Sequence, residues 1–173
     1  MKGANFATVN HMLINQLVLE AFQEIIPGTQ GSLVYFISHN IARREIVANQ
    51  ECWVHRKGAT RAFPAGHFAL KDTPFHETGH PILLPGNPTA GSCVMVADPG
   101  AEKSCYSVNH GAGRAKGRKA AIRELDQQTV DEEFTAHDIL TNCRTYPKDE
   151  APAAYKDFNE VLANLWWRLD KKL

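Results

Sequence analysis

The chain has 173 residues, of which 43% are hydrophobic and 22% charged, a composition typical of one soluble globular domain. This composition excludes a disordered tail, a collagen and a small disulfide scaffold. The formal net charge is +0, so an electropositive site requires local clustering of cations. No apolar run approaches the roughly 20 residues of a membrane span, and no signal-peptide pattern opens the chain. We therefore expect a cytoplasmic protein that does not contact a membrane.

The four cysteines are scattered along the chain without any CxxC pair: Cys52, Cys93, Cys105 and Cys143. Without a secretion signal, we expect them to be reduced. Small apolar side chains inside the fold are the ordinary role of such cysteines, and their spacing does not predict a zinc site.

Apolar residues recur at helical spacing through the first 26 residues, which predicts one long amphipathic helix. Its apolar positions are Phe6, Val9, Leu13, Ile14, Leu17, Val18, Ala21, Phe22 and Ile25. Pro27 and Gly28 are expected to end it. Residues 33–37 form a β-branched and aromatic run that predicts a buried strand, and residues 52–56 predict a second strand.

Five prolines between residues 64 and 92 predict a loop-rich middle with short strands at 82–84 and 93–97. Residues 114–125 and 130–140 have the pattern of helices. The tail, from Phe158 to Leu169, repeats apolar residues every three or four positions and predicts an amphipathic helix. The fold class is therefore α+β, with helices at both ends around a β-rich, loop-rich middle.

Residues 107–119 are the most informative segment for chemistry. Small residues follow His110, so backbone amides can approach a ligand, and cations follow within a few residues: Arg114, Lys116, Arg118 and Lys119. A phosphate-binding loop needs this combination, and an imidazole there can attack phosphorus to form a phosphoramidate. The alternative is an ordinary strand-to-helix turn followed by an exposed basic helix.

Three other segments carry candidate functional residues. Residues 53–61 place three cations, Arg56, Lys57 and Arg61, around the turn at Gly58, although a solvated loop has the same pattern. Residues 81–92 offer backbone amides and small hydroxyls, or are an ordinary turn. His39, which precedes Asn40, is a candidate metal ligand or a buried core histidine.

Taken together, these segments resemble the RtcB family, the GTP- and manganese-dependent RNA ligases of tRNA splicing and RNA repair. The shared motifs are HRKGATRA, PILLPGN with a nearby serine, HGAGR with a further arginine four residues on, and AYKD. The resemblance extends from the first helix to about Asp157. Four separate motifs in this order make a specific pattern.

The resemblance implies that His110 attacks the α-phosphate of GTP and carries GMP covalently. GMP then activates an RNA 3′-phosphate, 2′,3′-cyclic ends being opened first, and a 5′-hydroxyl displaces GMP. His39 would be a manganese ligand and Asn40 would lie beside the nucleotide. Catalytic cations would be Lys57, Arg114 and Arg118. The remaining nucleotide contacts would be Pro85, Gly86, Asn87, Pro88, Ser92, Gly111, Ala112, Gly113 and Tyr155.

The chain also departs from the family pattern. The N-terminal motifs written DVGCG, GNHF and HSGSRG do not occur in it, so residues 1–173 correspond to the C-terminal half. Asn87, Pro88 and Gly117 stand where the family has Ser, Met and Ser. Lys171 or Lys172 would have to replace the family's C-terminal lysine.

Two classes of function follow. The chain is either an RNA ligase, as one piece of a split enzyme or the product of a truncated gene, or a non-catalytic GTP- and RNA-binding module or remnant. The implied partners are RNA, a separate N-terminal half, a second copy of the chain, or archease. With one histidine ligand, His39, we expect the isolated chain to bind manganese weakly and to ligate nothing. Strands that pair with the N-terminal half would have open edges and exposed apolar faces, so we also expect self-association or binding to a partner chain.

Overall fold

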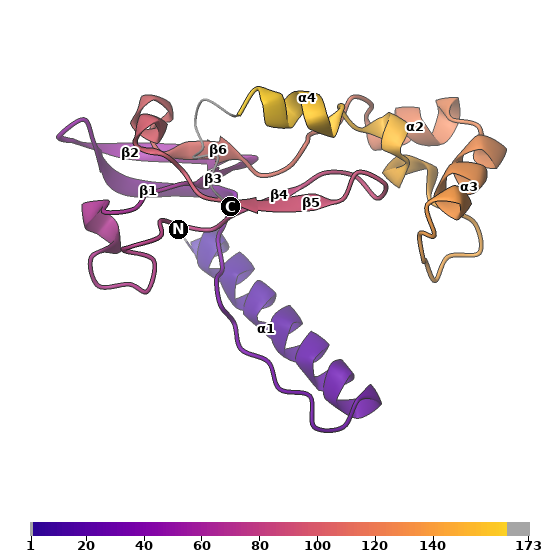
Figure 1. Cartoon of the computed structure of the whole chain (residues 1–173), viewed down its shortest axis with the longest axis horizontal. Coiled ribbons are helices and arrows are strands. Elements are labelled where there is room, and N and C mark those ends of the chain that lie inside the picture. The colour runs from indigo at the N-terminus through magenta and orange to yellow at the C-terminus, as the bar shows by residue number, and fades with distance from the viewer. Residues whose placement is uncertain (1, 166–173) are drawn as a thin grey trace.

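The computed structural model describes residues 2–165 and has an α+β architecture (Figure 1). Helix α1 (Lys2–Ile25) projects from a body of short strands, and α2 (Arg118–Glu124) and α3 (Gln127–Ala136) lie together at one end of that body. Helix α4 (Phe158–Ala163) lies along the body between them and the strands. The predicted fold class is confirmed.

The described strands form three two-stranded antiparallel sheets. The hairpin of β1 (Asn40–Val47) and β2 (Gln50–Lys57) turns at two residues with positive φ, Ala48 and Asn49. Strand β4 (Ile82–Pro85) pairs with β5 (Ser92–Met95) in a second hairpin.

The third sheet joins segments that are far apart in the sequence. Strand β3 (Ala59–Arg61) pairs with β6 (Ser107–Asn109), and its register places Ala59 opposite Asn109. The ends of these strands therefore bring Gly58 to His110. This long-range pairing builds the candidate site.

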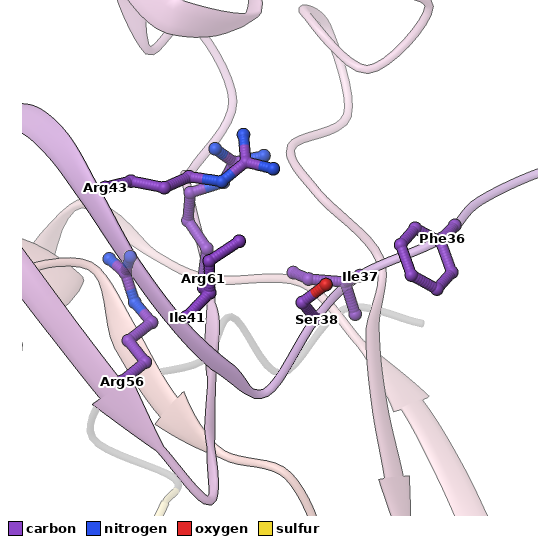
Figure 2. Close-up of a pocket in the computed structure, with 7 residues that line it drawn as sticks. All are labelled: Phe36, Ile37, Ser38, Ile41, Arg43, Arg56 and Arg61. Carbon is purple, nitrogen blue, oxygen red and sulfur yellow. The ribbon is translucent and has the colours of Figure 1, made fainter. Parts of the chain in front are cut away.

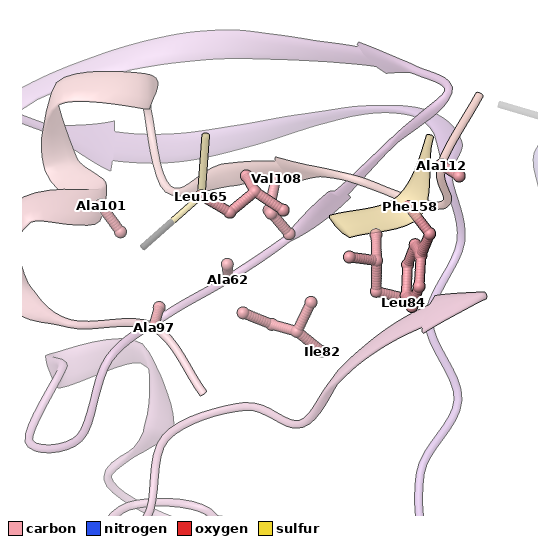
Figure 3. Close-up of a cluster of buried hydrophobic side chains, with 9 residues drawn as sticks. All are labelled: Ala62, Ile82, Leu84, Ala97, Ala101, Val108, Ala112, Phe158 and Leu165. Atoms are coloured by element: carbon pink, nitrogen blue, oxygen red, sulfur yellow. The ribbon is translucent and has the colours of Figure 1, made fainter. Parts of the chain in front are cut away.

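The main core lies where the strands meet α4 (Figure 3). Leu84 and Ile82 of β4 are fully buried, Val108 comes from β6, and Phe158 comes from the start of α4. Close packing of such side chains is the chief favourable contribution to folding. Because β6 leads directly into His110, this core supports the candidate site.

A buried ion pair lies within the β1–β2 hairpin, and its arginine also bonds to β6. The Arg56 guanidinium donates to both carboxylate oxygens of Glu45 at 2.7 Å, and its Nε donates to the Ser107 hydroxyl at 2.9 Å. Both charged side chains are at least 95% buried, so their mutual hydrogen bonds are required to offset desolvation. The sequence pattern did not reveal this pair because its members face each other only after the hairpin forms.

The predicted strand at 33–37 is wrong. The segment pairs with no strand among the described residues, and Leu33 and Val34 are 52% and 75% exposed. It runs back along α1 (Figure 1), where the Phe36 ring lies 5.6 Å from the His11 ring. β-Propensity describes fit to a half-buried sheet surface, and no neighbouring strand supplies that surface here. Strand β1, which follows it, was not predicted.

The other elements agree with the predictions more closely. The first helix and the strands at 52–56, 82–84 and 93–97 are confirmed within a few residues. Helix α2 begins at Arg118 rather than 114, because the Ala115 and Lys116 amides bond instead to the Ala154 carbonyl. Helix α3 ends at Ala136, before Asp138 adopts a left-handed conformation. Of the predicted tail helix, residues beyond 165 lie outside the described range.

The apolar side chains of α1 are exposed, although the helix itself was predicted correctly. Phe6 and Ile25, near its two ends, are 78% and 79% exposed, and most apolar residues between them are about half exposed. None of the helices described between residues 2 and 165 is long and apolar enough to cross a membrane.

Candidate nucleotide site

His110 is held in one orientation by the backbone of the β2–β3 turn. Its Nδ1 lies 2.9 Å from the Gly58 carbonyl oxygen. A carbonyl oxygen only accepts hydrogen bonds, so Nδ1 carries the proton and donates it. The neutral ring then has its lone pair on Nε2. That nitrogen is the one available for nucleophilic attack.

The turn at Gly58 is held in place by the residues before β1. The Gly58 amide donates to the His39 carbonyl at 2.8 Å and to the Asn40 side-chain oxygen at 3.0 Å. Gly58 has φ +69°, in the left-handed region that favours glycine. Asn40 therefore positions His110 indirectly, through the Gly58 peptide.

The imidazole rings of His39 and His110 are stacked, with centroids 4.4 Å apart and planes 7° from parallel. Burial, and then the neighbouring His110, lower the pKa of His39. Both effects favour the neutral ring, which is the form that binds a metal. Two of the residues predicted from separate motifs are thus in direct contact.

The residues after His110 fold tightly against the β4–β5 hairpin. The Ala112 amide donates to the Pro85 carbonyl at 2.9 Å. A side chain on Gly111 would lie 3.2 Å from that carbonyl oxygen, and Gly113 has φ +77°. Glycine at these two positions permits the close approach of the chain and the turn that follows.

A cleft of about 670 Å³ lies over this loop. His110, Gly111, Ala112 and Gly113 line it together with Gly58 and Asn109. The opposite wall comes from the AYKD segment and α4, with Lys156, Asp157, Glu160, Val161, Asn164 and Leu165. None of these six residues was predicted to line the site, although Lys156 and Asp157 belong to the AYKD motif.

Three of the four cations after HGAG, Arg114, Lys116 and Arg118, are paired with acidic residues in the folded chain. Arg118 contacts the carboxylates of Asp149 and Glu150 at 2.7 and 2.5 Å. Arg114 lies over the Tyr155 ring at 4.8 Å and donates to the Tyr155 hydroxyl at 3.2 Å. Burial, followed by the hydrogen bond to Glu150, raises the pKa of Tyr155. These residues form a cluster that does not line the cleft.

This pairing offsets the charge of three of the four cations that the sequence gathers in this segment. Lys116 is also paired, with Glu124 at 3.0 Å. Asp149 and Glu150 lie 31 and 32 positions after Arg118, so the sequence segment alone does not show these partners. The functional roles predicted for Arg114, Arg118 and Tyr155 remain predictions.

The loop at residues 85–92 packs against the His110 loop but does not line the cleft. Pro85 and Ser92 face each other in the β4–β5 register, and a side chain on Gly86 would collide with the Gly91 carbonyl and the Phe158 ring. The Asn87 side-chain oxygen accepts hydrogen bonds from the amides of residues 89 and 90. Pro88 follows within the same turn. Their predicted nucleotide contacts remain predictions.

Lys57 ends β2 next to Gly58 but lines a different groove, one that includes Asn40, His55 and the start of α1. The catalytic role predicted for Lys57 remains a prediction.

The donor set for manganese is incomplete within residues 2–165. No group of three or more His, Cys, Asp or Glu side chains in that range is arranged to hold a metal ion. All four cysteines are free, and none lines the cleft. His39 offers one imidazole, whereas a bound divalent metal ordinarily has several protein ligands. The described residues therefore do not by themselves fit a manganese ion.

Known proteins are similar to this chain in sequence over nearly its whole length. The family model described as tRNA-splicing ligase RtcB matches residues 1–169. Curated proteins named tRNA-splicing ligase RtcB are similar to the chain: 38% identical over 171 residues in Pyrococcus abyssi, 36% over 172 in Pyrobaculum aerophilum and 37% over 170 in Aeropyrum pernix. Each match covers 92% of this chain, but 19%, 35% and 35% of the respective relative.

Proposed function

Because this chain belongs to the RtcB family of tRNA-splicing ligases, we propose that it carries the nucleotide-accepting part of an RNA ligase. His110 is the proposed nucleophile, GTP the nucleotide and RNA the substrate. The observation that carries this proposal is the hydrogen bond from His110 Nδ1 to the Gly58 carbonyl, which assigns the lone pair of the neutral ring to Nε2 in a residue that lines the cleft.

In the proposed first step, the Nε2 lone pair attacks the α-phosphorus of GTP. A nitrogen–phosphorus bond forms, the bond to the bridging oxygen breaks, and pyrophosphate leaves with that electron pair. The Gly58 carbonyl stabilises the positive charge on the ring, because it accepts the Nδ1 proton's hydrogen bond throughout. Gly111 and Gly113 leave the approach to the cleft free of side chains.

In the next proposed steps, an oxygen of the RNA 3′-phosphate attacks the phosphorus of the His110–GMP adduct. The nitrogen–phosphorus bond breaks and its electron pair returns to Nε2. A 5′-hydroxyl then attacks the activated 3′-phosphate, GMP leaves, and the hydroxyl proton passes to solvent. Ends that carry a 2′,3′-cyclic phosphate must first be opened by water.

Manganese enters this proposal only through His39, which would supply one imidazole ligand while other donors come from elsewhere in the active ligase. Divalent metal neutralises developing phosphate charge in such reactions when it is bound. The chain covers 19–35% of the three relatives above, so we propose that further RtcB polypeptide completes the site. That polypeptide, a second copy of this chain and archease are the partners to test.

The proposal is tested by incubating the purified chain with GTP labelled at the α-phosphate and manganese, alone and with a polypeptide that contains the N-terminal RtcB motifs. We expect covalent label in the mixture, and its complete loss in His110→Ala. The matched control is His137→Ala, since His137 is exposed after α3 and lies outside the cleft. Label that persists on His110→Ala would refute the assignment.

The same assay separates the alternative function. If the wild-type mixture binds GTP in equilibrium dialysis but never becomes labelled, the chain is a non-catalytic nucleotide-binding module. RNA binding measured in parallel would then define its role.

A further inference from the structure

A second, more strongly charged cavity lies close to the His39–His110 pair. It has a volume of about 40 Å³ and lies between β1, β3 and the segment that precedes His39 (Figure 2). Three arginines line it, Arg43, Arg56 and Arg61, and so does Ser38. One water needs only about 10–15 Å³ by this measure, so the cavity has room for the oxygens of a larger group.

The charges around this cavity do not balance within the described residues. Glu45 is the one carboxylate there within ion-pair distance of these arginines, and both of its oxygens already accept from Arg56. Arg61 reaches it at only 4.0 Å. Arg43 has no carboxylate partner in this range. In Figure 2, the Arg56 guanidinium turns toward the hairpin, whereas those of Arg43 and Arg61 project to a common place.

Arg61 also has an unused donor. Its Nε is buried without a hydrogen-bond partner among the described residues. Burial, followed by the positive charge of Arg43, lowers the pKa of Arg61. An anion placed between the two guanidinium groups would remove the repulsion and accept the unused N–H bonds.

We propose that the cavity formed by Ser38, Arg43 and Arg61 binds a phosphate group of an RNA strand. A phosphate presents several acceptor oxygens, which match the planar donor fork of arginine. Ser38 directly precedes His39, and the His39 ring stacks on His110, so this phosphate would lie near the end that reacts. The choice of RNA over free phosphate rests on the proposed ligase function.

The test is RNA binding by Arg43→Gln, measured by fluorescence anisotropy with a labelled oligonucleotide that ends in a 3′-phosphate. We expect affinity to fall about tenfold, as for loss of one charged hydrogen bond. The slope of log K against log salt should fall by about 0.7, the value for one phosphate on a single strand. Arg43 is exposed and outside the core, so this variant should fold.

Arg44→Gln is the matched control. Arg44 is the next residue on β1 and has the same charge, but it pairs with Glu51 in solvent, where the two side chains are 59% and 61% exposed. Its affinity for RNA should change less than about twofold. Equal losses in the two variants would show a general charge effect and overturn the proposal.

A second measurement distinguishes RNA from free phosphate. Inorganic phosphate is titrated at constant ionic strength while the Arg61 Nε–H resonance is followed by NMR, and the RNA is then added as a competitor. We expect phosphate to shift this resonance and RNA to displace phosphate. A phosphate shift with unchanged RNA affinity in Arg43→Gln would assign the site to free phosphate, and no shift in either titration would overturn the site itself.

Failure of this proposal is distinguishable from failure of the proposed function. Arg43→Gln should retain labelling of His110 by GTP in the completed enzyme, because RNA takes no part in that step. Loss of His110 labelling in wild type would refute the ligase proposal while leaving both binding measurements informative. Unchanged RNA affinity in Arg43→Gln alongside normal labelling would refute only the phosphate site.

Discussion

Apolar side chains are buried in the body of the molecule but exposed on helix α1. Leu84 is completely buried between the β4–β5 hairpin and α4, whereas Leu17 of α1 is 53% exposed. In the body, strands and helix meet on several sides, whereas within residues 2–165 only the extended segment after α1 runs beside that helix (Figure 1). An amphipathic pattern therefore shows that a helix can be buried, and the surrounding structure decides whether it is.

The difference in burial also indicates which region stabilises the fold and which region can bind a partner. Burying apolar surface contributes about 25 cal/mol per Å², so the uncovered face of α1 represents stabilisation that a partner can still supply. Exposed apolar patches of this kind mark interaction surfaces. We expect the body to supply the stability of the folded chain and the apolar face of α1 to bind a partner.

The largest expected effect comes from paired leucine truncations. Leu84→Ala should lower the free energy of unfolding by about 2–5 kcal/mol, because it removes buried methyl groups and leaves a cavity. Leu17→Ala should change it by less than about 0.5 kcal/mol, as for an exposed position. Urea denaturation of both variants measures the two values. Similar losses in both would show that α1 is already covered in solution and would break the comparison.

Acid should destabilise the body through His80, which is buried among aromatic rings. Burial, and then the charge of Arg61, lower the pKa of His80 from 6.5 to about 4. The unfolded chain takes up a proton below about pH 6.5, whereas the folded chain does not until about pH 4. This contribution to stability is complete above pH 6.5 and is lost as the pH falls toward 4, by roughly 3 kcal/mol.

Denaturation curves at a series of pH values between 7 and 4 measure this loss. His80→Phe, which keeps a ring in the stack but cannot take up a proton, should have a shallower dependence on pH than wild type. An identical dependence in both proteins would show that His80 does not couple folding to pH.

The smallest effect on stability, with a clear effect on assembly, is expected from charges on α1. Leu13→Glu with Leu17→Glu should leave the free energy of unfolding nearly unchanged, because both side chains are about half exposed. The molar mass of the wild-type chain, measured by light scattering, should exceed the monomer mass of 19.2 kDa. The double variant should have the monomer mass.

The control for this experiment places the same charges on the polar residues Asn15 and Gln16 of the same helix. Asn15→Glu with Gln16→Glu should keep the wild-type mass. A wild-type chain that is monomeric at all concentrations would contradict the prediction.

Only part of the candidate site could be predicted from the sequence. The HGAGR motif located His110 and the small residues beside the cleft, since their chemistry is local to one loop. The Gly58 carbonyl, which selects the ring tautomer, was not found, because it lies 52 residues away and arrives through the β3–β6 pairing. The partners of Arg114 and Arg118 were missed for the same reason.

The sequence by itself determined the family, the α+β class, the long first helix and the short strands, because each depends on local pattern or on motifs read in order. Tertiary structure alone decided which side chains meet: His39 on His110, Arg56 on Glu45, and Arg43 beside Arg61. It also decided that, in the described part of the chain, residues 33–37 pair with no strand and the apolar side chains of α1 are exposed. Contacts of these kinds depend on what lies opposite a residue in space, which local periodicity does not encode.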